Sequence, residues 1–225
     1  MASGLSAAEF DAGATLDRRD VSLPVLLRLA GRRCVVVGGG ATAARRARAL
    51  RDAGAEVTVV APRIDDAIGP LGVTLRRREV EADDVAGAFL VVVATDNPAV
   101  NDQSAAWAAA AGALINRADD PAAGDLTVMA YAQDRGLTVA VDTGGASASA
   151  AGAIRDELAS RLDPAWPEVL AAARPWRAWL QDHVPDPAVR RSRLRRLTDE
   201  KAKSVFRESG AEALAEHLSR VANGR

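Results

Sequence analysis

The chain of 225 residues is poor in the side chains that enzymes most often use for covalent and metal chemistry. The single cysteine, Cys34, excludes an internal disulfide and a metal site built from several cysteines, and its apolar neighbours indicate a buried structural thiol. The two histidines, His183 and His217, are too far apart in sequence to form a local metal-binding pair. The two lysines, Lys201 and Lys203, leave nothing before residue 200 for Schiff-base chemistry. We therefore predict no metal ligands and expect carboxylates to supply any acid–base catalysis.

Long apolar runs and an excess of charge are also missing. The first twenty residues include four acidic residues and lack the apolar run of a signal peptide. No stretch approaches the ~18 consecutive apolar residues of a membrane span, and the formal net charge of −1 argues against a polybasic nucleic-acid binder. We therefore expect a cytoplasmic protein with no membrane or nucleic-acid partner, and a mobile tail over residues 1–20.

Aromatic residues make up only 4% of the chain, whereas 48% is hydrophobic and 50 residues are alanine, so the core must consist mainly of Ala, Val and Leu. In the first half, apolar runs rich in valine alternate with runs of helix formers. Strands are expected at 33–37, 56–60, 73–75, 88–93 and 112–116, and helices at 41–53 and 98–111. Fully apolar strands that alternate with helices are typical of a parallel sheet covered on both faces. The predicted fold class is therefore α/β, with a Rossmann-like sheet.

The pattern changes after residue 117. A strand pair is expected at 126–131 and 137–141, followed by a helix over 147–162. A further helix over 166–180 contains Pro175, which should kink it or end it early. The last helix is expected from 187 or 190 to 221, with an interruption near Ser209 and Gly210 as an open alternative.

A glycine-rich loop joins the first expected strand to the first helix. Its pattern, G-x-G-x-x-A, allows a tight turn, a close approach of the backbone to a pyrophosphate, and close packing of the helix on the strand. The helix N-terminus then offers N–H groups to the anion. We expect a dinucleotide to bind here, and the residues that would contact it are Gly38, Gly39, Gly40, Ala41 and Thr42.

Two other strand ends belong to the same expected cofactor site. The second strand ends at Ala61 without the usual acidic ribose contact, and Arg63 is either a partner for a 2′-phosphate or a solvated loop residue. NAD and NADP are therefore not distinguished by this rule. Thr95, Asp96 and Asn97 follow the fourth strand at the carboxyl edge of the sheet, where Asn97 either contacts a ligand or caps the next helix.

An ordered series of motifs resembles a known family. The motifs are VVVGGGATAARRARAL, GAEVTVVAP, VVVATDNPAVN, INRADDP and VAVDTGGASASAAGAIRDEL. In this order they resemble the precorrin-2 dehydrogenase / sirohydrochlorin ferrochelatase family, which includes the N-terminal module of siroheme synthase. The likeness covers about residues 22–165, and beyond it only a helical tail is shared.

The resemblance implies a function and a domain plan. Members oxidise precorrin-2, a tetrapyrrole, to sirohydrochlorin with NAD, and some also insert Fe(II), so iron insertion is a second and separate expectation. The family has a Rossmann domain, a dimerisation segment of strands and helix, and a small helical domain. We accordingly expect a homodimer whose chain divides into the tail (1–20), an NAD-binding Rossmann domain (21–118), a dimerisation segment (119–163) and a helical C-terminal domain (164–225).

The resemblance also assigns site residues. The essential aspartate of the family corresponds to Asp119, which we expect to be the catalytic base, because hydride removal leaves a proton to be lost. Asp120 stands beside it and can compete for this role, and either acid can instead only cap the turn before Pro121. The expected substrate contacts are Asn116, Arg117, Thr143, Gly144 and Gly145.

Three departures from the family pattern stand out. Asp142 adds negative charge near a site for a polycarboxylate, and the proline that usually starts the following helix is absent. The segment 126–129 lacks the Phe and Pro that the family tends to have. Arg117 replaces a residue that is usually small or apolar. Arg117 could offset Asp142 or bind an acetate arm of the substrate, and a surface salt bridge is an equal alternative.

Basic and aromatic residues elsewhere have mainly structural interpretations. The run 190–203 carries a local net charge of +5 and suits either the carboxylate arms of the substrate or a solvated helix face. Residues 76–78, all arginine, are expected to protect an edge strand from aggregation. Trp166, Trp176 and Trp179 are spaced to pack a small helical core. Two other functions remain as alternatives, namely a non-catalytic nucleotide-sensing Rossmann module and a chelatase-only tetrapyrrole protein.

Overall fold

The computed structural model describes residues 22–224, which form two compact units that meet in the chain between Val128 and Met129. Each unit is described by itself. The expected tail over residues 1–20 lies outside the described residues. The division falls further along the chain than residue 118 because the segment after β5 stays with the first unit. There, the backbone N–H groups of Asp125 and Leu126 both donate to the Ile115 carbonyl.

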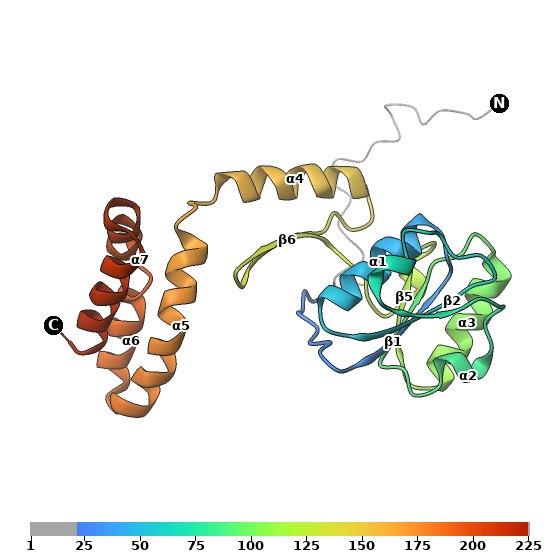
Figure 1. Ribbon diagram of the computed structural model, residues 1–225, viewed down its shortest axis with the longest axis horizontal. Helices are drawn as coiled ribbons and strands as arrows, with labels where there is room; N and C mark the ends of the chain where they lie inside the picture. Colours follow the sequence, from blue (N-terminus) through green and yellow to red (C-terminus); the bar gives the residue numbers. More distant parts are fainter. Residues whose placement is uncertain (1–21, 225) are drawn as a thin grey trace, which may run out of the picture. The chain divides into compact units, whose positions relative to one another are not determined.

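The first unit is built on a five-stranded parallel sheet in the order β3-β2-β1-β4-β5 (Figure 1). The strands are β1 (Arg33–Val37), β2 (Glu56–Val60), β3 (Thr74–Arg76), β4 (Leu90–Val93) and β5 (Leu114–Arg117). All five expected strands are confirmed. Strand β5 begins later than expected because Gly112 and Ala113 still belong to the end of the preceding helix. Their N–H groups donate to the carbonyls of Ala109 and Ala108, the pattern of a Schellman cap, and Gly112 has a φ of +70°.

Helices cover both faces of this sheet, as expected. Helix α1 (Ala41–Asp52) packs on one face, and α2 (Ala82–Val85) and α3 (Pro98–Ala110) pack on the other (Figure 1). The short helix η3 (Gly69–Leu71) adds its buried Leu71 to the α1 side. Small side chains allow the close approach of α1, since Ala43 and Ala47 are fully buried against the sheet. Cys34 is fully buried in β1, and burial raises the pKa of its thiol to about 11, which confirms a structural thiol.

Strand β3 lies at the edge of the sheet, and one arginine in it and one just after it are tied to α2. Asp84 of α2 has no exposed surface and accepts hydrogen bonds from Arg76 and Arg78, the latter at 2.6 and 2.8 Å. Burial opposes ionisation of Asp84, but the hydrogen bonds from Arg78, the Glu81 amide and Arg76 outweigh it and hold the pKa of Asp84 well below its usual range. An ion-pair cluster therefore joins the basic edge strand to α2.

The second unit begins with an antiparallel hairpin of β6 (Ala130–Asp134) and β7 (Leu137–Val141), on which α4 (Ala148–Arg161) packs. Strand β6 starts four residues later than expected, because the chain before it is still bonded to β5. Three helices follow, α5 (Trp166–His183), α6 (Pro187–Arg196) and α7 (Glu200–Ala222). They enclose a core of their own in which Trp176 and Trp179 pack, as predicted for these two tryptophans.

Two expectations for these helices are corrected. Pro175 does not end α5, which continues to His183; Ala171 and Pro175 are both exposed, so the carbonyl that loses its helical donor lies on the solvent side. The single last helix is two helices, because Asp199 starts α7 by accepting a hydrogen bond from the Ala202 N–H at 3.0 Å. The interruption near Gly210 is confirmed, with φ of +80° and ψ of −169°.

The basic run of α6 is partly structural. Arg190 donates to the Val184 carbonyl at 2.7 Å, and Arg193 donates to the Ala222 carbonyl at 2.7 Å, so both tie α6 to its neighbours. Arg191, Arg195 and Arg196 are exposed, as in a solvated helix face. Among residues 22–224, no helix is long and apolar enough to cross a membrane.

Candidate functional site

A cavity of about 960 Å³ lies at the carboxyl ends of the strands in the first unit. Its walls come from the loops that follow all five strands. Strand β1 lies between β2 and β4, so the chain leaves the middle of the sheet in two opposite directions at this point. Open parallel sheets bind their ligands in the crevice outside such a switch point. The residues that form the walls include 37–42, 60–65, 94–97, Val100, Ala118 and Asp119.

The glycine loop forms one end of this cavity, and its three glycines differ in what a Cβ would meet at each position. Gly38 has a φ of +124°, and a Cβ there would lie 2.3 Å from the Ala94 carbonyl oxygen. A Cβ on Gly39 would lie 1.9 Å from the Arg63 carbonyl oxygen. At Gly40 a Cβ would meet nothing within 4 Å, so the backbone there borders open space.

The first turn of α1 is left open toward the cavity. Gly40 is the N-cap residue, so no side chain accepts a hydrogen bond from the first N–H groups, and the first turn holds no acidic residue. Gly40, Ala41 and Thr42 all line the cavity. Uncapped N–H groups beside a glycine backbone are what the pyrophosphate of a dinucleotide requires, so these residues fit NAD.

The loop after β2, where the ribose of a dinucleotide would lie, presents both a basic and an acidic residue. Ala61 is buried, Arg63 and Asp65 are exposed, and all three line the cavity. The Asp65 N–H donates to the Gly39 carbonyl at 2.8 Å, which brings this loop against the glycine loop. Asp65 was not predicted from the sequence, although it stands only four residues beyond the position where an acidic ribose contact is usual.

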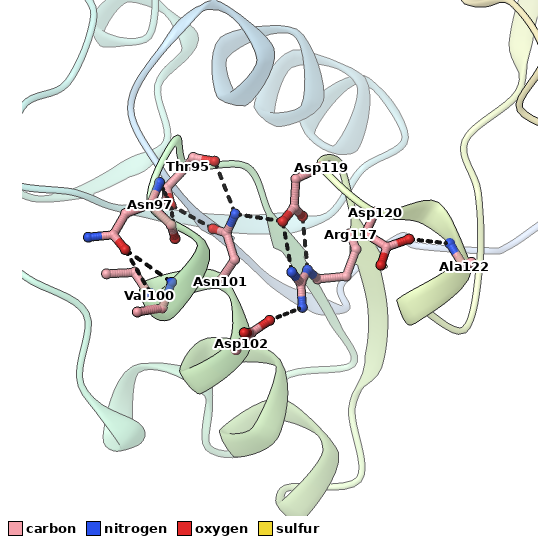
Figure 2. Close-up of polar contacts among 10 residues, drawn as sticks. Thr95, Asn97, Val100, Asn101, Asp102, Arg117, Asp119, Asp120 and Ala122 are labelled. Atoms are coloured by element: carbon pink, nitrogen blue, oxygen red, sulfur yellow. Dashed lines mark hydrogen bonds and ion pairs between the residues drawn. The ribbon is translucent and has the colours of Figure 1, made fainter.

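Thr95, Asn97 and Asn101 form a chain of hydrogen bonds at the start of α3 (Figure 2). Asn97 Oδ1 accepts from the N–H groups of Ala99 and Val100 at 3.0 and 3.3 Å, so the helix-capping interpretation is confirmed. Thr95 Oγ1 donates to Asn101 Oδ1 at 2.6 Å, which turns the Asn101 amide nitrogen toward Asp119. Asn101 was missed from the sequence; its place one helical turn after the cap residue is the signal that could have found it.

Asp119 stands on the cavity wall just after β5 and is held by three hydrogen bonds (Figure 2). Arg117 donates from Nε to Oδ1 at 2.9 Å and from Nη2 to Oδ2 at 2.7 Å. Asn101 Nδ2 donates to Oδ2 at 2.9 Å. The Asp119 side chain is 31% exposed, whereas the Arg117 side chain is 7% exposed.

These contacts set the charge of Asp119. The Arg117 guanidinium, with the Asn101 amide, outweighs burial and holds the pKa of Asp119 well below its usual range. Asp102 of α3 accepts from Arg117 Nη1 at 3.0 Å, so the guanidinium bridges two carboxylates. These contacts therefore favour the ionised form of Asp119.

The neighbours of Asp119 in sequence have other positions. Asp120 Oδ1 accepts from the Ala122 N–H at 3.2 Å and caps the short helix η4 (Pro121–Ala123), so Asp120 takes the turn-capping role that the sequence left open for either acid (Figure 2). Asn116 is 2% exposed and donates from Nδ2 to the Leu126 carbonyl at 2.9 Å, and it is not among the cavity-lining residues. Arg117 is buried and forms ion pairs with Asp119 and with the exposed side chain of Asp102, so the salt-bridge interpretation is confirmed, although the guanidinium itself lies below the surface.

The remaining expected substrate residues lie in the second unit, in the turn before α4. Gly144 and Gly145 have φ values of +61° and +80°, which favour glycine. Thr143 Oγ1 accepts from the Ser147 N–H at 3.2 Å, and Ser147 caps α4 by accepting from the Ala150 N–H at 3.1 Å. Ser147 thus starts the helix without the proline of the family pattern, and the substrate role of this turn stays a prediction.

Comparisons with known proteins agree with this geometry. A family model described as putative NAD(P)-binding matches residues 25–130. The siroheme synthase of Nitrosococcus oceani is 31% identical over 173 residues, which are 75% of this chain and 37% of that protein. The siroheme synthase of Pseudomonas aeruginosa PAO1 is 34% identical over 205 residues, which are 88% of this chain and 44% of that protein.

One solved structure is matched by this chain over its whole length. The precorrin-2 dehydrogenase SirC superposes with a TM-score of 0.71 at 26% identity, over 90% of this chain and 100% of that chain. This chain spans about two fifths of the length of the siroheme synthases that it matches. This chain is therefore similar to siroheme synthases and to the precorrin-2 dehydrogenase SirC, and residues 25–130 match a family described as putative NAD(P)-binding.

Proposed function

We propose that the protein oxidises precorrin-2 to sirohydrochlorin with NAD as the hydride acceptor. The observation that carries the proposal is the place of Asp119, a fixed carboxylate on the wall of the same cavity whose glycine loop fits a pyrophosphate. The resemblance to a precorrin-2 dehydrogenase and to siroheme synthases supports the substrate.

The reaction removes two electrons and two protons from the tetrapyrrole. One proton leaves with the electron pair as a hydride, which NAD accepts when bound, and the other must be lost to a base. Hydride loss puts positive charge on the tetrapyrrole. A carboxylate that is already ionised and fixed stabilises this charge as it develops.

Asp119 is suited to this late proton transfer. Its low pKa makes it a weak base toward the reduced substrate. The substrate proton becomes acidic only as the hydride departs, so the weak base then receives a proton that is easy to lose. Asp119 in this role both stabilises charge and accepts the proton, and its two oxygens are kept in place by Arg117 and Asn101.

Substrate contacts and a dimer are part of the proposal. Asn116 and the turn of Thr143, Gly144 and Gly145 remain the proposed substrate residues. A homodimer is supported by the outer face of α4, where Ile154, Leu158 and Leu162 are 42, 45 and 38% exposed at a spacing of four residues, the last just past the helix end. Tyr131 of β6 is also 40% exposed. Exposed apolar faces of this kind mark contact surfaces.

Iron insertion is a second and separate proposal, as is a cytoplasmic location. Inserting Fe(II) as a substrate requires the loss of pyrrole protons, and the same carboxylate, Asp119, is ionised and able to take them. The two activities differ in their need for NAD.

The test is incubation of the purified protein with precorrin-2, with and without NAD and with and without Fe(II). The proposal predicts a sirohydrochlorin absorbance spectrum and NADH only when NAD is present. Binding of NAD without any conversion would support the nucleotide-sensing alternative. Metal insertion into sirohydrochlorin with no NAD-dependent oxidation of precorrin-2 would support the chelatase-only alternative.

A further inference from the structure

An arginine, Arg117, stands at the end of β5, where it pairs in register with Val93 of β4. The three inner strands have valines at this level, and the other edge strand, β3, has Arg76. The Arg117 side chain is 7% exposed, and burying a guanidinium is costly unless its charge is paired. The pairing comes from two carboxylates on different elements, Asp119 after β5 and Asp102 on α3.

We propose that Arg117 is a positioning residue for the dehydrogenase reaction, which holds the carboxylate of Asp119 in one orientation and in its ionised form, while Asp102 holds Arg117. This inference rests on the proposed function, because it gives Asp119 a task in the reaction. It differs from the substrate contact that the sequence suggests for this arginine.

The geometry of the pair supports orientation rather than simple charge balance. Nε and Nη2 of Arg117 bind the two different oxygens of Asp119, so the planes of the two groups are aligned (Figure 2). Asn101 adds a third hydrogen bond. A carboxylate has about four acceptor sites, so these three hydrogen bonds leave about one site for a substrate proton.

Asp102 completes the arrangement. It takes the remaining Nη1 of the fork at 3.0 Å, and its own side chain is 74% exposed. The three charges together have a net charge of −1, so the site keeps a negative charge although an arginine is buried in it. Without Asp102 the pair would be neutral and less able to stabilise a positively charged tetrapyrrole.

The other charged groups near Asp119 form none of the three hydrogen bonds that hold its carboxylate. Arg63, Asp65, Glu79 and Asp96 line the same cavity from the loops after β2, β3 and β4. Asp120 is next in sequence and is bonded to its own turn. The ionisation of Asp119 is set by the Arg117 fork first and by the Asn101 amide after it.

The direct test reads the carboxylate itself and needs no substrate. We would label the aspartate carboxyl carbons with ¹³C, assign the Asp119 signal by its loss in Asp119→Asn, and titrate wild type, Arg117→Met and Arg117→Lys. Wild type should show no Asp119 titration above about pH 3, whereas Arg117→Met should titrate near or above the ordinary aspartate pKa of about 4. Arg117→Lys, which keeps the charge and loses the fork, should titrate between them.

Arg48→Met is the matched control, because Arg48 is an exposed arginine of α1. It should leave the Asp119 titration unchanged. An Asp119 titration in Arg117→Met equal to that of wild type would overturn the proposal. So would an Asp119 that titrates normally in wild type. If Arg117→Met does not fold by circular dichroism, Arg117→Lys decides the same question.

A kinetic readout separates positioning from substrate binding. With precorrin-2 as substrate, Arg117→Met should lower kcat by about 10–100-fold, in the range expected for a misplaced catalytic group, with a smaller change in KM. Its activity should also fall at acid pH where that of wild type does not. A raised KM with unchanged kcat would instead make Arg117 a substrate contact and contradict the proposal. If wild type does not turn over precorrin-2, the proposed function fails, while the ¹³C titration still decides whether Arg117 controls Asp119.

Discussion

Asp119 is the residue on which the proposed chemistry depends. Replacing it by asparagine keeps the size of the side chain and removes the negative charge that accepts the proton. We expect Asp119→Asn to lower kcat by about 10²–10⁴-fold, the usual contribution of a general base, with NAD affinity changed by less than about twofold. NADH formation and an NAD titration by calorimetry measure the two quantities. Asp120→Asn is the control, since Asp120 caps η4; a loss of turnover in this variant alone would transfer the role to Asp120.

The glycine loop gives a prediction in which two neighbouring residues behave differently. In Gly39→Ala the new Cβ would meet the Arg63 carbonyl, so the loop must shift, and both the melting temperature and NAD affinity should fall. In Gly40→Ala the Cβ meets open space in the free protein, and the backbone there, with φ of −85°, suits alanine. We expect this variant to keep its melting temperature and to bind NAD about tenfold or more weakly, a change of roughly 1.4 kcal/mol. An unchanged NAD affinity in Gly40→Ala would show that Gly40 does not face the cofactor.

At the scale of residues, the sequence predicted those parts of the site that lie in short continuous motifs. The strand–glycines–helix pattern placed residues 38–42 on the cavity, and the motif around Asp119 placed this acid at a strand end on the same wall. The partners of Asp119 could not be predicted in the same way. Asn101 and Asp102 come from a helix that starts before β5, and only the packing of α3 on the sheet brings them to Arg117.

At the scale of elements, the edge of the sheet depends on an ion-pair cluster. Asp84→Asn keeps the shape of the side chain and loses charge-assisted hydrogen bonds to Arg76 and Arg78. We expect the free energy of unfolding to fall by about 2 kcal/mol near neutral pH. Urea denaturation followed by circular dichroism measures it.

The same cluster predicts a pH dependence. The pKa of Asp84 is depressed in the folded protein, so its stabilisation is fully present above the ordinary aspartate pKa of about 4 and is lost as the pH falls toward the lower folded value. The difference in unfolding free energy between wild type and Asp84→Asn should therefore shrink below about pH 4. A difference that stays constant down to about pH 3 would contradict this account.

The elements were predicted well wherever apolar runs or capping residues mark them. The wrongly predicted ends of strands and helices each have a local structural cause. Residues 112 and 113 belong to the turn at the end of α3 and not to β5. Helix α5 continues past Pro175 because this proline is exposed. Asp199 caps a new helix, so the last helix is divided in two. In each case the deciding factor is a hydrogen bond or an exposure that depends on the folded surroundings.

At the scale of the whole molecule, the outer face of α4 predicts self-association. Leu158→Glu puts a charge in the middle of the Ile154, Leu158 and Leu162 row. We expect it to convert a dimer to a monomer, measured by analytical ultracentrifugation. Val189→Glu is the control, because Val189 is 39% exposed on α6, away from this row. A wild-type monomer, or a dimer that persists in Leu158→Glu, would remove this face from the interface.

The strand and helix patterns change character after residue 117, whereas the two compact units of the structure divide between Val128 and Met129. The position of the division was harder to predict. The segment between Ala118 and Val128 has no regular structure beyond η4, yet it is bonded to β5 through Asp125 and Leu126. Such backbone contacts between a loop and a strand leave no periodic pattern in the sequence.

The central claim is that this protein oxidises precorrin-2 at the expense of NAD. The most direct measurement is to follow sirohydrochlorin and NADH together after adding NAD to the protein with precorrin-2. The account predicts that both appear at the same rate and in equal amounts, and that neither appears with Asp119→Asn on the same timescale. NAD that binds while precorrin-2 remains unchanged, or sirohydrochlorin that forms without NADH, would contradict it.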